Sequence, residues 1–309
     1  MSNVSGLASS EVHRIPHIDS MEDLLRAEIF PVEILQKHNA FPDALFFHGR
    51  EYLIFRSAPH HNLHKKSVLI LSSREGDGAW KIETTIQGVG YDVRDPRLVV
   101  FEGTIHIYFA AVNKGLRRPV IAIMHSVLQP DNTWSTPMQV YASGYLPSRV
   151  HVVGGKLYMT VYEEWTLKRS SHLQCQIIVS DDGTKWSRDT EFGVLCVEGM
   201  ESDCVSIDPD ILLWIVRNDI GTKMPVGSNI YMIRRDGQVE NVHNTRVKYD
   251  SPLLIRRGDA IYLLSRLQLS FAGRYRIASS RLPRIFRDAV NIGLYFCTPK
   301  TTALSQIDR

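Results

Sequence analysis

One pattern of residues recurs five times along this chain of 309 residues and constrains its fold more than any other feature. Each copy begins with a polar stretch containing Asp or Arg, continues as an alternating apolar strand, turns at Gly or Asp, and returns as a second apolar strand. The copies begin near residues 41, 95, 147, 202 and 250. Their starts lie roughly 50 residues apart, a period typical of structural units repeated around a ring or along an array.

Further apolar stretches follow the first two strands of each copy. In the first unit they are residues 67–73 and 80–86, which brings the unit to four strands, and helical periodicity hardly occurs. Four antiparallel strands per repeat make one propeller blade. The sequence therefore predicts an all-β fold, a β-propeller with five blades of four antiparallel strands. A six-bladed ring of the sialidase type, with the sixth blade assembled from both termini, is the alternative.

The five copies fit a single domain. We expect residues 1–26 to form an N-terminal extension and residues 27–309 to form the propeller, with strands from both ends of the chain closing the ring. Closure would remove the exposed strand edges that an open array leaves. The N-terminus lacks the features of a signal peptide, and no run approaches the ~18 apolar residues of a membrane span. We therefore expect a soluble, cytoplasmic protein.

The charge and the cysteines exclude several classes of function. A net charge of +3, from 36 basic and 33 acidic residues, is close to balance and argues against binding to nucleic acid or to an anionic membrane surface. The four cysteines form no CxxC pair, so they are expected to be isolated thiols and not metal ligands. We expect no metal and no cofactor. The sequence leaves the oligomeric state open.

A second, independent repeat supports the first. Polar turns that end in Trp occupy residues 72–80, 127–134 and 180–186. The last of them, SDDGTKW, resembles the Asp-box hairpin of sialidases and related glycosidases. In that hairpin Asp and Gly shape the turn, and the aromatic ring packs between blades.

Polar residues mark the same two positions in every repeat. In a propeller, the start of the first strand and the end of the second strand of each blade converge on one end of the central channel. The starts supply Asp43, Arg94, Asp95, Arg149, Glu201, Asp203, Tyr249 and Asp250. The ends supply Arg56, Glu163, Glu164, Arg217 and Arg266. Any one of these residues can be explained as a turn cap or a solvated side chain, but together they predict a site.

Three of the strand ends carry arginine: Arg56, Arg217 and Arg266. Like charges facing one channel repel unless an anion or carboxylates lie between them. A ligand that bears a carboxylate or a phosphate is the natural partner of such a cluster. The pattern therefore favours a carbohydrate with an acidic group, or another small anionic ligand.

The fourth unit, residues 201–219, resembles the sialidase segment in which a Glu begins a strand and an Arg ends it. The resemblance implies that Glu201 assists a tyrosine nucleophile and that Arg217 and Arg266 hold a substrate carboxylate. The run YDSPL is similar to the nucleophile motif of that family and would place the nucleophile at Tyr249. The chain departs from the sialidase pattern in one motif. Sialidases carry an RIP motif at the entry to the first blade, whereas the RIP of this chain, at residues 14–16, precedes the first predicted strand.

The second unit supports a different mapping. Its sequence RDPRL, residues 94–98, resembles elements of the five-bladed glycosidases of the fructosidase, arabinanase and mannoside phosphorylase type. That resemblance implies that Asp43 is the nucleophile or base and that Asp95 stabilises the charged sugar. The general acid would be Glu163, Glu164 or Glu201.

Histidines and aromatic residues add candidates for sugar contact. His60, His61 and His64 follow the first Arg-terminated strand, where they would act as proton donors, sugar ligands or metal ligands, or simply form a solvated loop. Tyr91, Tyr145 and Trp165 are candidate sugar platforms, with blade packing as the alternative.

These residues favour a glycoside hydrolase-like carbohydrate-active enzyme with acid and base carboxylates at the channel mouth. Cleavage of a glycosidic bond needs an acid for the leaving oxygen and a carboxylate, or a nucleophile activated by one, for the oxocarbenium-like centre. A non-catalytic propeller that binds a glycan or a protein through the same face is one alternative. A propeller-fold lyase is another.

Overall fold

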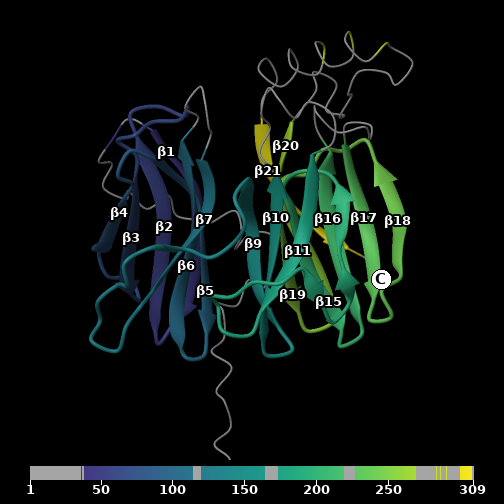
Figure 1. Ribbon diagram of the computed structural model, residues 1–309, viewed down its shortest axis with the longest axis horizontal. Coiled ribbons are helices and arrows are strands. Elements are labelled where there is room, and N and C mark those ends of the chain that lie inside the picture. Colours follow the sequence, from purple (N-terminus) through teal and green to yellow (C-terminus); the bar gives the residue numbers. More distant parts are fainter. Residues whose placement is uncertain are drawn as a thin grey trace, which may run out of the picture.

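The structure, a computed structural model, describes residues 36, 38–113, 120–163, 173–218, 227–268, 283, 286, 290 and 300–307. Five antiparallel sheets follow one another along the chain as the blades of a β-propeller (Figure 1). The purple and blue strands of the first two blades lie at the left of the view, and the teal to green strands of the later blades at the right. The predicted all-β class and the five-bladed propeller are both confirmed.

Four blades have four strands each, in sequence order from the channel outward. Blade 1 contains β1 (His38–Phe47), β2 (Arg50–Ala58), β3 (Val68–Glu75) and β4 (Lys81–Gln87). Blade 2 contains β5 (Asp92–Phe101), β6 (Thr104–Asn113), β7 (Val120–Val127) and β8 (Met138–Gln139). Blade 3 contains β9 (Tyr145–Val153), β10 (Lys156–Glu163), β11 (Gln174–Ser180) and β14 (Cys196–Glu198), with a short hairpin of β12 (Asp189–Thr190) and β13 (Gly193–Val194). Blade 4 contains β15 (Ser202–Asp208), β16 (Ile211–Asn218), β17 (Gly227–Arg234) and β18 (Val239–Thr245).

Blade 5 draws on the C-terminal end of the chain. In the described residues it consists of β19 (Asp250–Arg257), β20 (Ala260–Gln268) and β21 (Lys300–Ile307). β21 pairs with β20 from Ile261 to Gln268, so a strand from the C-terminal end of the chain completes this sheet, as expected from the sequence. The predicted N-terminal extension and most of the proposed N-terminal strand lie outside the described residues.

The core lies between the blades. Four apolar clusters occupy the junctions of blades 1 with 2, 2 with 3, 3 with 4, and 4 with 5. Trp214 in β16, for example, is completely buried against the side chains of blade 3. The second strands of blades 1 to 4 (β2, β6, β10 and β16) are covered on both faces and are therefore mostly apolar. Cys175 and Cys204 are buried as free thiols in the junction of blades 3 and 4, and Cys196 is also a free thiol.

The turn formed by residues 180–186 joins blade 3 to blade 2. Asp182 Oδ1 accepts hydrogen bonds from the backbone N–H groups of Thr184 and Lys185, and the ring of Trp186 packs edge-on against Tyr108, with centroids 5.4 Å apart. Tyr108 in turn donates a hydrogen bond to the carbonyl of Gly183 at 2.8 Å. The aromatic ring therefore lies between blades, which is the arrangement expected from the sequence of this turn.

Two buried histidines extend this junction. His106 Nδ1 and His125 Nε2 lie 2.9 Å apart, and His125 stacks on Tyr108 with ring centroids 4.7 Å apart. Burial lowers the pKa of His106 to about 4, and burial together with the proximity of His106 lowers the pKa of His125 to about 4. Both rings are therefore neutral at neutral pH.

The structure contains no helix, within the residues it describes, that is long and apolar enough to cross a membrane.

We expect acid to destabilise the junction of blades 2 and 3. Unfolded histidines titrate near 6.5, so the unfolded chain binds protons that the folded chain excludes as the pH falls from about 6.5 to about 4. The free energy of unfolding, measured with urea, should fall by about 2 kcal/mol or more between pH 7.5 and 4.5 because of this pair. The double variant His106→Gln, His125→Gln should lose clearly less over the same interval. An unchanged pH dependence in that variant would contradict the assignment.

Candidate functional site

The same backbone distortion opens the innermost strand of three blades. The pairing of the first two strands shifts between Ala40 and Asp43, between Arg94 and Arg97, and between Asp250 and Leu253. Inside each bulge, one residue with positive φ precedes a proline: Phe41 (57°), Asp95 (51°) and Ser251 (48°). Positive φ costs energy in a residue with a side chain, and such strain concentrates at functional sites.

The three arginines of the repeat occupy equivalent positions. In the second strands of blades 1 and 5, Arg56 pairs with Ala40, and Arg266 pairs with Asp250. In blade 4 the backbone N–H of Arg217 donates to the carbonyl of Glu201. These residues lie at the same end of the channel as the bulges. Blades 2 and 3 carry Ala110 and Tyr162 at this position.

Glu201 and Asp250 lie in a dense cluster of charges between blades 4 and 5. Arg217 Nη1 is 2.7 Å from Glu201 Oε2 and 3.1 Å from Asp250 Oδ1. Arg266 Nη2 lies 3.3 Å from Asp250 Oδ2, and Lys248 Nζ lies 3.4 Å from Asp250 Oδ1. Asp250 is almost completely buried, and its carboxylate lies among three cationic side chains.

Ser251, a bulge residue, fixes Glu201 from the neighbouring blade. Its backbone N–H and its hydroxyl both donate to Glu201 Oε2, each at 2.9 Å. Burial alone would raise the pKa of Glu201, but Arg217, the hydrogen bonds from Ser251 and the charge of Arg266 lower it to about 2. Glu201 is therefore firmly ionised in this arrangement.

Arg149 connects this cluster to blade 1. Its Nε donates to the carbonyl of Pro252 at 3.1 Å, and its Nη2 donates to the carbonyl of Ser251 at 3.4 Å. Its Nη1 lies 3.6 Å from Asp43 Oδ1. Arg149 thus spans the channel from blade 3 to blades 5 and 1, and it links the environment of Asp43 to the bulge that holds Glu201.

A second group of charges lies between blades 1 and 2. Arg94 Nε is 3.1 Å from Asp95 Oδ2, and the guanidinium of Arg94 lies over the ring of Phe41 at 4.7 Å. Two of the bulge residues, Phe41 and Asp95, therefore hold the same arginine. Arg94 and Asp95 retain partial exposure, with 18% and 8% of their side-chain surface accessible.

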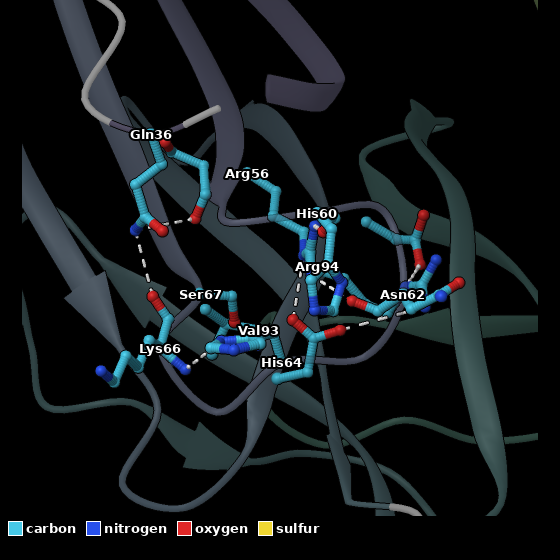
Figure 2. A network of polar contacts seen from close by, with 12 residues as sticks. Gln36, Arg56, His60, Asn62, His64, Lys66, Ser67, Val93 and Arg94 are labelled. Carbon is cyan, nitrogen blue, oxygen red and sulfur yellow. Dashed lines mark hydrogen bonds and ion pairs between the residues drawn. The ribbon is translucent and has the colours of Figure 1, made fainter. Parts of the chain in front are cut away.

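Arg56 makes internal contacts with Asp92 and with the loop after β2. The sequence suggested that it binds a substrate anion, but its side chain is completely buried and its guanidinium is occupied. Its Nε donates to Asp92 Oδ1 at 2.9 Å, and its Nη1 and Nη2 donate to the carbonyls of His60 and Asn62 (Figure 2). Arg56 therefore holds the histidine-containing loop and does not face the channel mouth.

Asp43 and Asp203 lie one layer deeper and join consecutive blades. Asp43 Oδ2 accepts the backbone N–H of Leu98 at 2.8 Å, and Asp203 Oδ2 accepts the backbone N–H of Leu254 at 2.6 Å. Asp203, predicted from the sequence as a substrate-binding residue, is completely buried. Asp43 keeps 17% of its side-chain surface accessible, so it joins the blades and also faces the channel.

The remaining predicted residues are distributed around the mouth. The ring of Tyr249 packs against the apolar cluster between blades 4 and 5, and burial raises its pKa. Glu163 ends β10 and pairs with Tyr145, and Tyr91 lies half-buried directly before β5. His60 and His61 are exposed in the loop after β2. Glu164 and Trp165 lie outside the described residues.

Four residues that hold the charges of the site were not predicted from the sequence. Asp92, Lys248, Ser251 and Phe41 were not singled out, although each holds one of the predicted charges. A signal for two of them exists, since Phe41 and Ser251 precede proline at equivalent repeat positions. Within the described part of the chain, no group of three or more His, Cys, Asp or Glu side chains is arranged to hold a metal ion.

We expect Glu201 to remain ionised far below its ordinary range. Its carboxyl carbon shift, assigned by difference from the Glu201→Gln variant, should show no titration step between pH 7 and pH 4, because the folded pKa is about 2. The ionised form then contributes stability above about pH 4.5 that is lost as the pH falls towards 2. Ser251→Ala should raise the pH midpoint of the Glu201 titration, because it removes the hydrogen bond from the Ser251 hydroxyl to Glu201. A wild-type midpoint at or above 4.5 would be the contrary result.

Comparison with known proteins identifies the fold. No protein-family model and no curated protein matches the chain. Among solved structures, a Trypanosoma rangeli sialidase in complex with 2,3-difluorosialic acid matches with a TM-score of 0.53 and 13% identity, over 76% of this chain and 44% of that chain. A Bombyx mori beta-fructofuranosidase matches with a TM-score of 0.46 and 12% identity, over 74% of this chain and 55% of that chain. A Cellvibrio cellulosa alpha-L-arabinanase matches with a TM-score of 0.42 and 14% identity, over 64% of this chain and 76% of that chain. The chain thus spans less than half the length of the sialidase, and it shares the β-propeller fold of that structure.

Proposed function

We propose that the chain is a carbohydrate-active enzyme of the glycoside hydrolase type and that its site is the channel mouth described above. The observation that carries the proposal is the link made by Arg149, which connects Asp43 of blade 1 to the Ser251 bulge that holds Glu201. Asp95 adds a carboxylate from blade 2 at the equivalent bulge. Carboxylates from separate blades at one channel end are the groups that glycosidic cleavage needs.

The surroundings of the carboxylates support distinct roles. Asp43 is oriented by the N–H of Leu98 and faces the channel, which suits a nucleophile or base. Asp95, paired with Arg94, suits the stabilisation of the charged sugar. Glu201, with its pKa lowered to about 2, suits electrostatic stabilisation or activation of a nucleophile more than proton donation. Glu163 at the end of β10 is then the candidate general acid.

A tyrosine nucleophile of the sialidase type is less well supported. Tyr249 lies directly before β19, but its ring packs against the apolar cluster of blades 4 and 5. Burial raises its pKa, which disfavours the phenolate. The carboxylate mapping of the five-bladed glycosidases therefore fits the geometry better.

An acidic group on the sugar fits the exposed cations of the mouth. Arg266 has 43% of its side-chain surface accessible and Arg94 has 18%, whereas Arg56 is completely buried. A guanidinium binds a carboxylate through two parallel hydrogen bonds. We therefore assign substrate anion binding to Arg266 and Arg94, and an internal role to Arg56.

A non-catalytic glycan-binding propeller is the second candidate. The low pKa of Glu201 favours it, because it removes one of the candidate general acids that glycosidic cleavage needs. The two candidates differ in one outcome, which is whether a bound sugar is turned over.

We expect turnover of at least one member of a panel of chromogenic glycosides that includes sialosides and uronides. Asp43→Asn, Asp95→Asn and Glu201→Gln should each lower kcat by about 10²-fold or more, since each removes a charge that acts in the transition state. Initial rates by absorbance, with circular dichroism to verify folding, measure the effect.

Asp210→Asn is the matched control for the carboxylate variants. Asp210 is an exposed carboxylate in the turn between β15 and β16, at the opposite end of β15 from Glu201. Its rate should equal that of the wild type. Full activity in all three mouth variants would sink the enzyme assignment, and sugar binding without any turnover would favour the binding module.

A further inference from the structure

The loop formed by residues 59–66 is fixed from below by one buried arginine. Arg56 is 0% exposed, and its Nη1 and Nη2 donate to the carbonyls of His60 at 3.2 Å and Asn62 at 3.1 Å. These two carbonyls flank His61. Figure 2 shows Arg56 directed at the backbone of this loop. The sequence alone suggested that nothing orients the histidines, whereas the structure holds the backbone on both sides of His61.

Other contacts secure the far end of the loop. Gln36 Nε2 donates to the carbonyl of Lys66 at 3.1 Å, and the N–H of Lys66 donates to His64 Nδ1 at 3.1 Å. Ser67 Oγ then accepts the N–H of Val93 at 2.8 Å, which ties the loop end to blade 2. The loop is therefore anchored at its middle and at its end.

The ring of His61 lies on the bulge of blade 1. It packs against Phe41, with centroids 5.6 Å apart, and against His38, with centroids 5.0 Å apart. Phe41 carries the guanidinium of Arg94, which holds Asp95. A short series of contacts thus leads from His61 to the candidate carboxylate of blade 2.

The groups around His61 are cationic or neutral. Burial lowers the pKa of His61, and Arg94 from β5, His38 from β1, Arg56 from β2 and Arg266 from β20 lower it further. His61 is therefore a neutral imidazole at pH 7, with one donor and one acceptor nitrogen. The charge of Arg266, the arginine that we assign to the acidic group of a sugar, is one of those that lower the pKa of His61.

The residue type at position 56 matches this positioning role. A buried ion pair such as Arg56 with Asp92 contributes little net stability, because desolvation of both charges offsets their attraction. The planar guanidinium can bond a carboxylate and two carbonyls at the same time, whereas a lysine ammonium lacks this rigid fork. Arg56→Lys therefore keeps the charge beside Asp92 but removes the two hydrogen bonds to the carbonyls of His60 and Asn62.

We infer that His61 contacts the bound sugar through its neutral imidazole and that Arg56 is the positioning residue that holds it at the mouth. The sugar contact rests on the proposed function. The positioning by Arg56 does not, because it can be measured in the protein without a ligand.

Backbone ¹⁵N order parameters test the positioning. Residues 60–62 should be rigid in the wild type, with values of about 0.85, and should fall below about 0.6 in Arg56→Lys, while residues in β10 stay unchanged. The His61 titration should rise towards 6.5 in the same variant, since the loop no longer holds the ring among the cations. Mobile residues 60–62 in the wild type would overturn the inference even if Arg56→Lys fails to fold.

Binding of free glucuronic acid, followed by chemical shifts, tests the contact. The affinity should fall about 10-fold in His61→Gln and in Arg56→Lys, which is the loss of one hydrogen bond. The double variant should be no weaker than His61→Gln, because Arg56 acts through His61. His243→Gln is the matched control, since His243 is exposed on β18, the outermost strand of blade 4, and it should bind like the wild type.

The outcomes separate the two proposals. Wild-type affinity in His61→Gln would overturn the contact while leaving the proposed function intact. Absence of both glucuronic acid binding and turnover of any glycoside in the panel would overturn the proposed function and the contact together. The order parameters would still decide whether Arg56 positions the loop.

Discussion

Backbone N–H groups of one blade donate hydrogen bonds to a carboxylate of the preceding blade, and these bonds set the geometry on which the site depends. No strand ladder joins the blades in the described part of the chain, so apolar packing and side-chain contacts hold them together. Near the channel, Asp43 of blade 1 accepts the N–H of Leu98 of blade 2, and Asp203 of blade 4 accepts the N–H of Leu254 of blade 5. These contacts fix the height of neighbouring innermost strands relative to each other. The bulges that begin those strands are fixed with them.

Asp203 also shows how charge is compensated inside the channel. Its Oδ1 accepts the N–H of Cys204 and lies 2.6 Å from His151 Nε2 of blade 3. Although burial opposes it, the proximity of Asp203 raises the pKa of His151 and so favours the imidazolium form beside the buried carboxylate. One side chain thereby joins blades 3, 4 and 5. The contacts that join these blades therefore also hold a buried charge near the channel.

Backbone strain and buried charge occur together at the mouth, where blade packing does not require them. Positive φ angles at Phe41, Asp95 and Ser251 each cost energy, and each of these residues holds a charged neighbour. Apolar clusters between the blades already supply the burial that stabilises a propeller. Features that cost energy and recur at one end of the channel are therefore best explained by function.

The sequence predicts the architecture well and the site only in part. The repeat period fixes the blades, and the equivalence of Arg56, Arg217 and Arg266 follows from aligning the copies. Their roles do not follow, because the partners lie on neighbouring blades roughly 50 residues away. Arg56 and Arg217 look alike in sequence, yet one is completely buried beneath a loop and the other joins Glu201 to Asp250. The low pKa of Glu201 likewise depends on Ser251, a residue of the next repeat.

A crystal structure of the protein with glucuronic acid tests the central claim, that the mouth between the bulges is a carbohydrate site, most directly. The account predicts the sugar at this mouth, with its carboxylate on Arg266 and its hydroxyl groups within hydrogen-bonding distance of Asp95 and His61. A mouth without sugar at saturating concentration, or sugar bound only on the outer surface of the blades, would contradict it.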